Sequence, residues 1–203
     1  MVRLIDLGLE KLHELLDRMI EETIMTMNEL LNLKTINVSR LDEISKRIRS
    51  IKDEVHDLVM EIIIRYQPVA SDLRDLKSAL EISYGLYRIT RYIRDIVYTI
   101  ADSKVDFSQC KEAEIERVMK IVKNMLTHTL RAYKDRDEKL AREVIEMDKE
   151  VDEAFRRYFN KALSSGKTCD IINLLILRSL ERLADHCVYI AESTLFVLGK
   201  RSV

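Results

Sequence analysis

The second half of the sequence carries acidic residues at a spacing that could bind a cation. Asp148 and Asp152 are four residues apart, as are Glu181 and Asp185, and Glu192 follows on the same flank of its segment. At about 100° per residue, Asp148 falls inside an apolar stripe. An ionised carboxylate there is costly unless a cation, a hydrogen-bond donor or a metal compensates it. Carboxylate oxygens suit iron, manganese, magnesium or zinc, so the pairs Asp148/Asp152 and Glu181/Asp185 could converge on such a cation if their two helices pack against each other.

An alternative needs no metal. Acids one helical turn apart are common on solvated helix faces, and basic residues lie close to these acids in the sequence. Arg156, Arg178 or Arg182 could neutralise them in ordinary ion pairs. Residue spacing alone leaves both interpretations open.

The elements that must position these acids are helices. The chain has 203 residues with 4 Gly and 1 Pro, while 47% of residues are hydrophobic and 34% are charged, which suits amphipathic helices. Apolar residues recur at steps of three and four, and Pro68 and the stretch 164–167 punctuate the pattern. The pattern predicts an all-α fold with a linker at 102–109. The expected helices cover about 9–31, 39–66, 68–101 and 111–133, then a helix from the turn at 134–137 to about 164, and finally 169–198.

The helix lengths repeat in the order medium, long, long. Residues 86–92 align with 180–186 at an offset of 94, since 180 minus 86 is 94, and both segments share leucine and arginine in place. Any two amphipathic helices of similar length align passably, but the matching order favours a duplication. We therefore predict two pseudo-symmetric antiparallel three-helix bundles, with domains at 1–102 and 110–203.

The two halves differ at the positions of the acids. Where the second half has carboxylates, the first half has Lys52 and His56, at the offset of 96 by which the preceding helices align, and Tyr87, Arg91 and Tyr98 at the offset of 94. A charged ammonium or guanidinium group cannot ligate a metal. A metal site is therefore expected only in the C-terminal bundle, and the first half is expected to fill this space with a charge pair or stacked side chains.

Composition also excludes some classes of function and location. The net charge of -1 argues against a protein that binds nucleic acid through its phosphates, and no apolar run has the length of a membrane span or a secretion signal. Cys110, Cys169 and Cys187 are odd in number and form no C-x-x-C pair, so neither a disulfide nor a thiolate zinc site is expected. We predict a cytoplasmic protein. No nucleophile motif is present, so we do not expect an enzyme.

Three stretches resemble the PhoU family of phosphate-signalling regulators: 67–74, with the sequence QPVASDLR, 144–153, and 180–192. The resemblance implies a six-helix protein of two pseudo-symmetric bundles whose Glu/Asp-x-x-x-Asp pairs hold multinuclear iron or zinc clusters. It also implies a negative regulator of phosphate uptake and of the phosphate response. The implied partners are the ATPase subunit of the phosphate transporter and a sensor kinase.

Carried over to this sequence, the family's ligands would be Asp148, Asp152, Glu181 and Asp185, with Glu192 as a further candidate. The segment 86–91, with the sequence LYRITR, departs from the family's LER-x-x-D pattern in the first half. An iron or zinc cluster is therefore expected in the C-terminal bundle only. The oligomeric state stays open, with a homodimer as one alternative.

Two other functions stay open at this point. One is a metal-free helical scaffold or chaperone-like interaction protein, in which the acids are only ion-paired. The other is a carboxylate-bridged metal oxidase, although the sequence has a lone Glu-x-x-His at Glu10 and His13 where such bundles use two. His186 adjoins Asp185 and is the histidine best placed to support a metal ligand.

Overall fold

The computed structural model describes residues 3–31, 38–110 and 112–200. Throughout these ranges the regular structure is helical, which confirms the all-α prediction. The elements in chain order are α1 (Leu4–Leu31), α2 (Val38–Tyr66), α3 (Ser71–Asp102), the 3₁₀ helix η1 (Phe107–Cys110), α4 (Ala113–Asp135), α5 (Glu138–Ser165) and α6 (Thr168–Val197).

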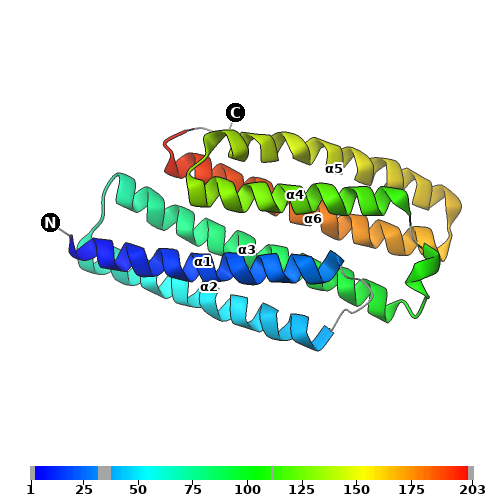
Figure 1. The fold of residues 1–203 in the computed structure, drawn as a ribbon, viewed down its shortest axis with the longest axis horizontal. Coiled ribbons are helices and arrows are strands. Elements are labelled where there is room, and N and C mark those ends of the chain that lie inside the picture. The colour runs from blue at the N-terminus through cyan, green and yellow to red at the C-terminus, as the bar shows by residue number, and fades with distance from the viewer. Residues whose placement is uncertain (1–2, 32–37, 111, 201–203) are drawn as a thin grey trace.

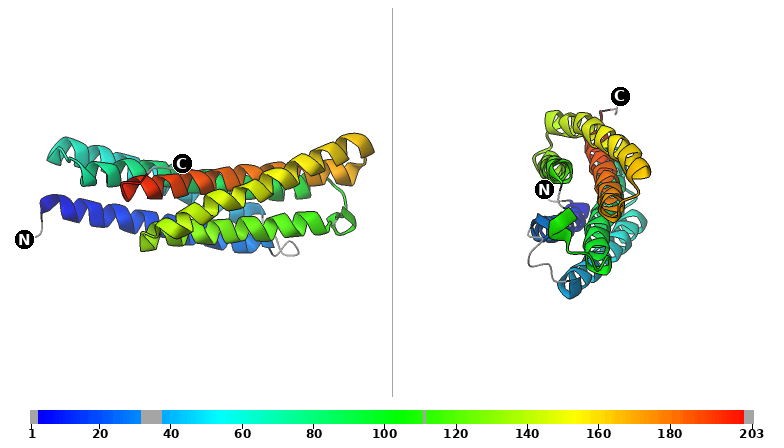
Figure 2. Two further views of the ribbon diagram at one scale, coloured as in Figure 1. Left: turned by 90° about the horizontal axis from the view of Figure 1, so that it is seen from above. Right: turned by 90° about the vertical axis from the view of Figure 1, so that its right-hand side faces the viewer.

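The helices form two antiparallel three-helix bundles side by side, α1–α3 and α4–α6, as predicted (Figure 1). Helices α3 and α6 pack along each other and join the bundles, and the end-on view places them in the middle of the molecule (Figure 2). The α2–α3 and α5–α6 connections lie at opposite ends of the long axis (Figure 1). No helix within the described ranges has a stretch long and apolar enough to cross a bilayer.

The helix ends predicted around α5 are confirmed. Asp137 caps its N-terminus, because its carboxylate accepts hydrogen bonds from the backbone N–H groups of Lys139 and Leu140. Gly166 ends the helix in the left-handed conformation, with φ of 60°, and its N–H donates to the carbonyl of Ala162. These caps fix the length of the helix that carries Asp148.

Other boundaries differ from the prediction. Pro68 does not open the third helix, which begins at Ser71, because the backbone first turns through positive φ at Gln67 (46°) and Ala70 (51°). The first helix begins at Leu4, and part of the predicted linker forms η1. Residues 32–37, between the first two predicted helices, lie outside the described residues.

The contact between the two bundles is close because Gly85 has no side chain. A Cβ atom at Gly85 would lie 2.6 Å from Cγ1 of Ile190 on α6, and Ile190 is itself fully buried. Nearby, Ser78 donates a hydrogen bond to the carbonyl of Ser193, whose hydroxyl donates to Glu81. An apolar contact and two linked hydrogen bonds thus hold α3 against α6.

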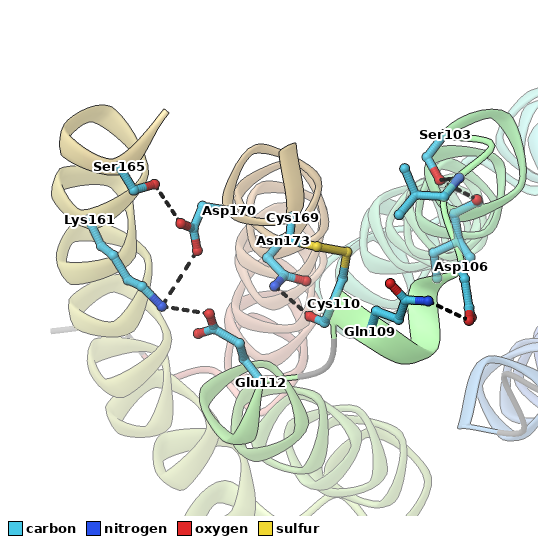
Figure 3. The surroundings of a disulfide bond; sticks show 12 residues. Ser103, Asp106, Gln109, Cys110, Glu112, Lys161, Ser165, Cys169, Asp170 and Asn173 are labelled. Atoms are coloured by element: carbon cyan, nitrogen blue, oxygen red, sulfur yellow. Dashed lines mark hydrogen bonds and ion pairs between the residues drawn. A yellow bond between two sulfur atoms is a disulfide. The ribbon is translucent and has the colours of Figure 1, made fainter. Parts of the chain in front are cut away.

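The cysteine prediction is wrong. Cys110 in η1 and Cys169 at the start of α6 form a disulfide, although 59 residues separate them, and Cys187 is free and buried (Figure 3). The amide of Asn173 donates a hydrogen bond to the carbonyl of Cys110 and fixes the same junction. Residue spacing could not predict this pair, because only the packing of η1 against α6 brings the two cysteines together.

Candidate metal centre

Asp148 is the acid that the fold places least favourably for a charge. It lies on the face of α5 that packs against α6, between the buried side chains of Val144 and Val151. Its Oδ1 atom is buried and has no hydrogen-bond partner. Burial, and then the neighbouring carboxylates Asp152, Asp185 and Glu181, raise the pKa of Asp148 to about 6. Among the residues that the structure describes, no basic side chain forms an ion pair with Asp148.

The other acids converge on the same place. Burial and then the charge of Asp185 raise the pKa of Glu181, and Arg178 and Arg182 partly oppose this rise. Burial also raises the pKa of Asp185, with a further contribution from Asp152 on α5. The packing of α5 on α6 thus brings together four of the acids that are predicted as metal ligands from the sequence. We call this set the acidic group: Asp148, Asp152, Glu181 and Asp185.

Arginines on the same helices neutralise three members of the acidic group. Arg156 is 3.3 Å from Asp152, Arg178 is 3.1 Å from Glu181, and Arg182 is 3.1 Å from Asp185. These are the ion pairs of the metal-free alternative. Two of the three pairs join side chains that are both more than a third exposed, so each contributes little stability and a stronger cation could displace it.

The acidic group is not arranged as a set of metal ligands. Across the ranges that the structure describes, no three histidine, cysteine, aspartate or glutamate side chains are close enough to hold one ion. Its chemistry nevertheless fits a hard cation, because the donors are carboxylate oxygens and the buried Oδ1 of Asp148 has no partner. Glu192 is exposed and lies seven residues beyond Asp185, about 10 Å along the helix axis.

On the equivalent face of the first bundle, the described residues form no such acidic group. Lys52 forms an ion pair with Asp53 at 2.7 Å, and its Nζ lies 5.8 Å from the centre of the Tyr87 ring. The Nε2 atom of His56 is buried without a partner, and burial followed by the charge of Lys52 lowers the pKa of this imidazole. Tyr98 donates a hydrogen bond to Asp42 at 2.8 Å. A charge pair and ring contacts therefore occupy this face, as the sequence predicts.

His186 faces aromatic rings. Its ring stacks on Tyr92 at 5.7 Å between centres and meets Tyr84 and Tyr189 edge-on at 6.0 and 6.2 Å. Burial, and then the charges of Arg88 and Arg182, lower the pKa of this imidazole to about 4, so it is neutral at pH 7. Sequence reasoning did not single out Arg88 or this group of rings. The spacing of residues 84, 88 and 92, one turn apart on one helix, was the available signal.

Comparison with known proteins places this arrangement in a family. The PhoU domain model matches residues 9–100 and 115–194. A phosphate-specific transport system accessory protein PhoU homolog from Zymomonas mobilis is 30% identical over 177 residues, which cover 84% of this chain and 75% of that protein. A protein of the same description from Clostridium acetobutylicum is 28% identical over 215 residues, which cover 99% of this chain and 97% of that protein.

Solved structures of PhoU proteins share the fold of this chain. The crystal structure of PhoU from Pseudomonas aeruginosa superposes with a TM-score of 0.80 at 24% identity and covers 96% of this chain and 98% of that one. The PhoU structure from Streptococcus pneumoniae superposes with a TM-score of 0.71 at 18% identity. These two structures support the six-helix fold. Because the family model matches both bundles across most of the sequence, the chain belongs to the PhoU family.

Proposed function

We propose that this chain is a regulatory accessory protein of a phosphate transport system and represses phosphate uptake and the phosphate response when phosphate is abundant. The observation that carries the proposal is the PhoU match across both bundles, together with relatives that are named accessory proteins of phosphate-specific transport. The activity is binding of protein partners. The partners that we propose are the ATPase subunit of the transporter and a sensor kinase.

Exposed apolar side chains provide surfaces that a protein partner could cover. At the α2–α3 end of the molecule, Ile64 and Val69 are 72% and 74% exposed, and at the α5–α6 end Leu163 is 68% exposed. Contiguous exposed apolar patches are typical of interaction sites, and each end has a further exposed apolar residue one turn away on its helix, Met60 on α2 and Phe159 on α5.

A gene deletion tests this proposal. We expect cells without the gene to take up phosphate faster and to express phosphate-response genes in phosphate-replete medium, and the wild-type gene to reverse both effects. An Ile64→Asp, Leu163→Asp variant should fold but complement poorly, whereas the exposed control Glu153→Gln should complement fully. Unchanged uptake and expression in the deletion strain would refute the proposal.

The cytoplasm is the compartment that we propose, because the ATPase subunit and the kinase would be met there. The expected absence of a disulfide does not support this location, since two of the three cysteines form one. The location therefore rests on the proposed partners.

We also propose that the acidic group binds an iron or zinc ion or cluster, in the C-terminal bundle only. Asp148, Asp152, Glu181 and Asp185 would supply oxygen ligands, and the bound cation would compensate the buried charge of Asp148. Arg156, Arg178 and Arg182 would have to release their carboxylates. Glu192 lies about 10 Å along the helix axis from Asp185, so it is a weaker candidate than the acidic group.

The second candidate function is a metal-free scaffold, which the three arginine pairs favour. Elemental analysis distinguishes it from the metal site. Protein purified without chelator should contain bound iron or zinc, and an Asp148→Ala, Glu181→Ala variant should lose it. A Glu146→Gln, Glu153→Gln variant removes exposed acids from the same helix and should keep the metal. Equal metal content in all three proteins would refute the site assignment, and absence of metal from all three would leave the metal-free scaffold.

A further inference from the structure

Arg88 on α3 has lost the carboxylate partners of its counterpart in the other bundle. At the repeat offset of 94, Arg88 corresponds to Arg182, which is 3.1 Å from Asp185 and 3.6 Å from Glu181. The counterparts of these two carboxylates are Arg91 and Tyr87. The substitution thus replaces both acids around this arginine, one by a phenol and one by a second arginine.

The contacts of Arg88 leave its charge without a counter-ion. Its guanidinium donates a hydrogen bond to the hydroxyl of Tyr92 and lies 4.9 Å from the centre of the Tyr92 ring. Its Nε is buried and has no hydrogen-bond partner. Since Tyr92 also stacks on His186, these rings hold the guanidinium in place. Among the described residues, no carboxylate forms an ion pair with Arg88.

Arg91 adds a second uncompensated charge beside the first. It lies three residues after Arg88 on α3, so the two side chains are neighbours on the helix surface. Arg91 is partly exposed and forms no ion pair with any described residue, including Asp95 one turn further along the helix. Lys52 lies on the α2 side of Tyr87, but Asp53 already neutralises it. The face therefore keeps the charges of the two arginines.

We propose that Arg88 and Arg91 form a binding site for a phosphate-type oxyanion. A phosphate group carries a charge of about -1.5 to -2 at pH 7, which would compensate both arginines, whereas a single carboxylate would compensate only one. Guanidinium groups present several N–H donors in a fixed geometry that matches phosphate oxygens. The group could be free orthophosphate or the phosphoryl end of a nucleotide. This site does not depend on the proposed regulation of transport.

Calorimetry on the full chain at constant ionic strength tests the site, with orthophosphate and ATP titrated separately. Whichever anion binds the wild type, Arg91→Gln should weaken its binding about tenfold, the loss expected for one charge-assisted hydrogen bond. Arg88→Gln should have a similar effect. Arg18→Gln removes an exposed arginine from α1 and should bind as the wild type does. Tighter binding of orthophosphate would identify the free ion as the ligand, and tighter binding of ATP the nucleotide.

Three outcomes would overturn the site: neither anion binds the wild type, Arg91→Gln binds as tightly as the wild type, or Arg18→Gln weakens binding as much as Arg91→Gln. Arg91 forms no ion pair or side-chain hydrogen bond within the part of the chain that the structure describes, so its replacement should not unfold the protein, and this variant decides the question even if Arg88→Gln folds poorly. Because the readout is anion binding in vitro, its result is separate from uptake in the deletion strain.

Discussion

The two bundles share a backbone arrangement but place opposite charges at equivalent positions. In the second bundle, the packing of α5 on α6 gathers carboxylates, and arginines from the same helices neutralise three of them. In the first bundle, Arg88 and Arg91 occupy the matching face of α3 without a carboxylate partner among the described residues. A duplicated fold fixes where such side chains meet, but the residue types decide whether the place favours a cation or an anion.

Near the start of the third helix of each bundle, a second pair of equivalent positions also carries different residue types. Cys169 on α6 corresponds to Asp75 on α3, since 169 minus 75 is 94. Cys169 is bonded to Cys110 in η1, whereas Asp75 forms an ion pair with Arg136 at 3.1 Å, from the turn between α4 and α5. One position is held covalently and its counterpart only by charge, so the two should contribute very differently to stability.

The largest effect should come from the disulfide. Cys110→Ser removes the cross-link, which closes a long loop between η1 and α6 and restricts the unfolded chain. We expect a loss of about 3–4 kcal/mol in the free energy of unfolding, measured with urea in the absence of reductant. Wild-type protein treated with dithiothreitol is the control and should match the variant. Equal stability of the variant and the oxidised wild type would contradict this expectation.

The contact between the bundles should give the next largest effect. Gly85→Leu inserts a side chain where even a Cβ would lie 2.6 Å from Ile190, so α3 and α6 must separate or repack. We expect a loss of about 2–3 kcal/mol, seen as a lower urea midpoint. Ser50→Leu, at an exposed position of α2, is the matched control and should change stability little. An unchanged midpoint for Gly85→Leu would mean that the bundles are not closely packed here.

The stability of the metal-free protein should depend on pH through Asp148 in the acidic group. The pKa of Asp148 is about 6 in the folded chain against 3.8 ordinarily, so its ionisation costs stability as pH rises from about 4 through 6. Asp148→Asn should therefore stabilise the metal-free protein at pH 7 by about 1–2 kcal/mol, after a reduction for partial solvent exposure. The gain should disappear at about pH 4, where the wild-type carboxyl is protonated.

Glu153→Gln is the control for this measurement, because Glu153 is an exposed acid on the same helix. Thermal unfolding across the pH range should show no comparable gain for it. A gain for Asp148→Asn that persists unchanged at pH 4 would show that the effect is not electrostatic.

The smallest effect should come from the ion pair at the counterpart of Cys169. Asp75→Asn breaks the contact with Arg136, whose side chain is 39% exposed, so the loss should be at most about 1 kcal/mol. The loss should also shrink in 1 M sodium chloride, because salt screens exposed charges. Urea unfolding in low and high salt measures both. A loss as large as that of Cys110→Ser would contradict the contrast between the two positions.

Much of the fold could be predicted from the sequence because the signals are local. Apolar periodicity predicts the helices, and Asp137 and Gly166 mark the ends of α5. The sequence predicts that the third helix begins at Pro68, because proline favours the first turn of a helix, but the positive φ of Ala70 delays its start to Ser71.

The candidate site was predictable only in part. The helical spacing of Asp148 and Asp152 predicts that they share a face, and the same holds for Glu181 and Asp185. Spacing does not determine which carboxylate is buried without a partner and which are paired with arginine. The ring contacts of His186 likewise depend on α3, which is distant in the sequence.

The sequence by itself determined the helices, the duplication and the reversal of charge between the halves, because periodicity and residue type are properties of neighbouring residues. Only the tertiary structure decided which distant residues meet. It paired Cys110 with Cys169, buried Oδ1 of Asp148 without a hydrogen-bond partner among the described residues, and let Gly85 bring α3 against α6. These contacts depend on how whole helices pack, which is set by the complementary shape of surfaces that lie far apart in the chain.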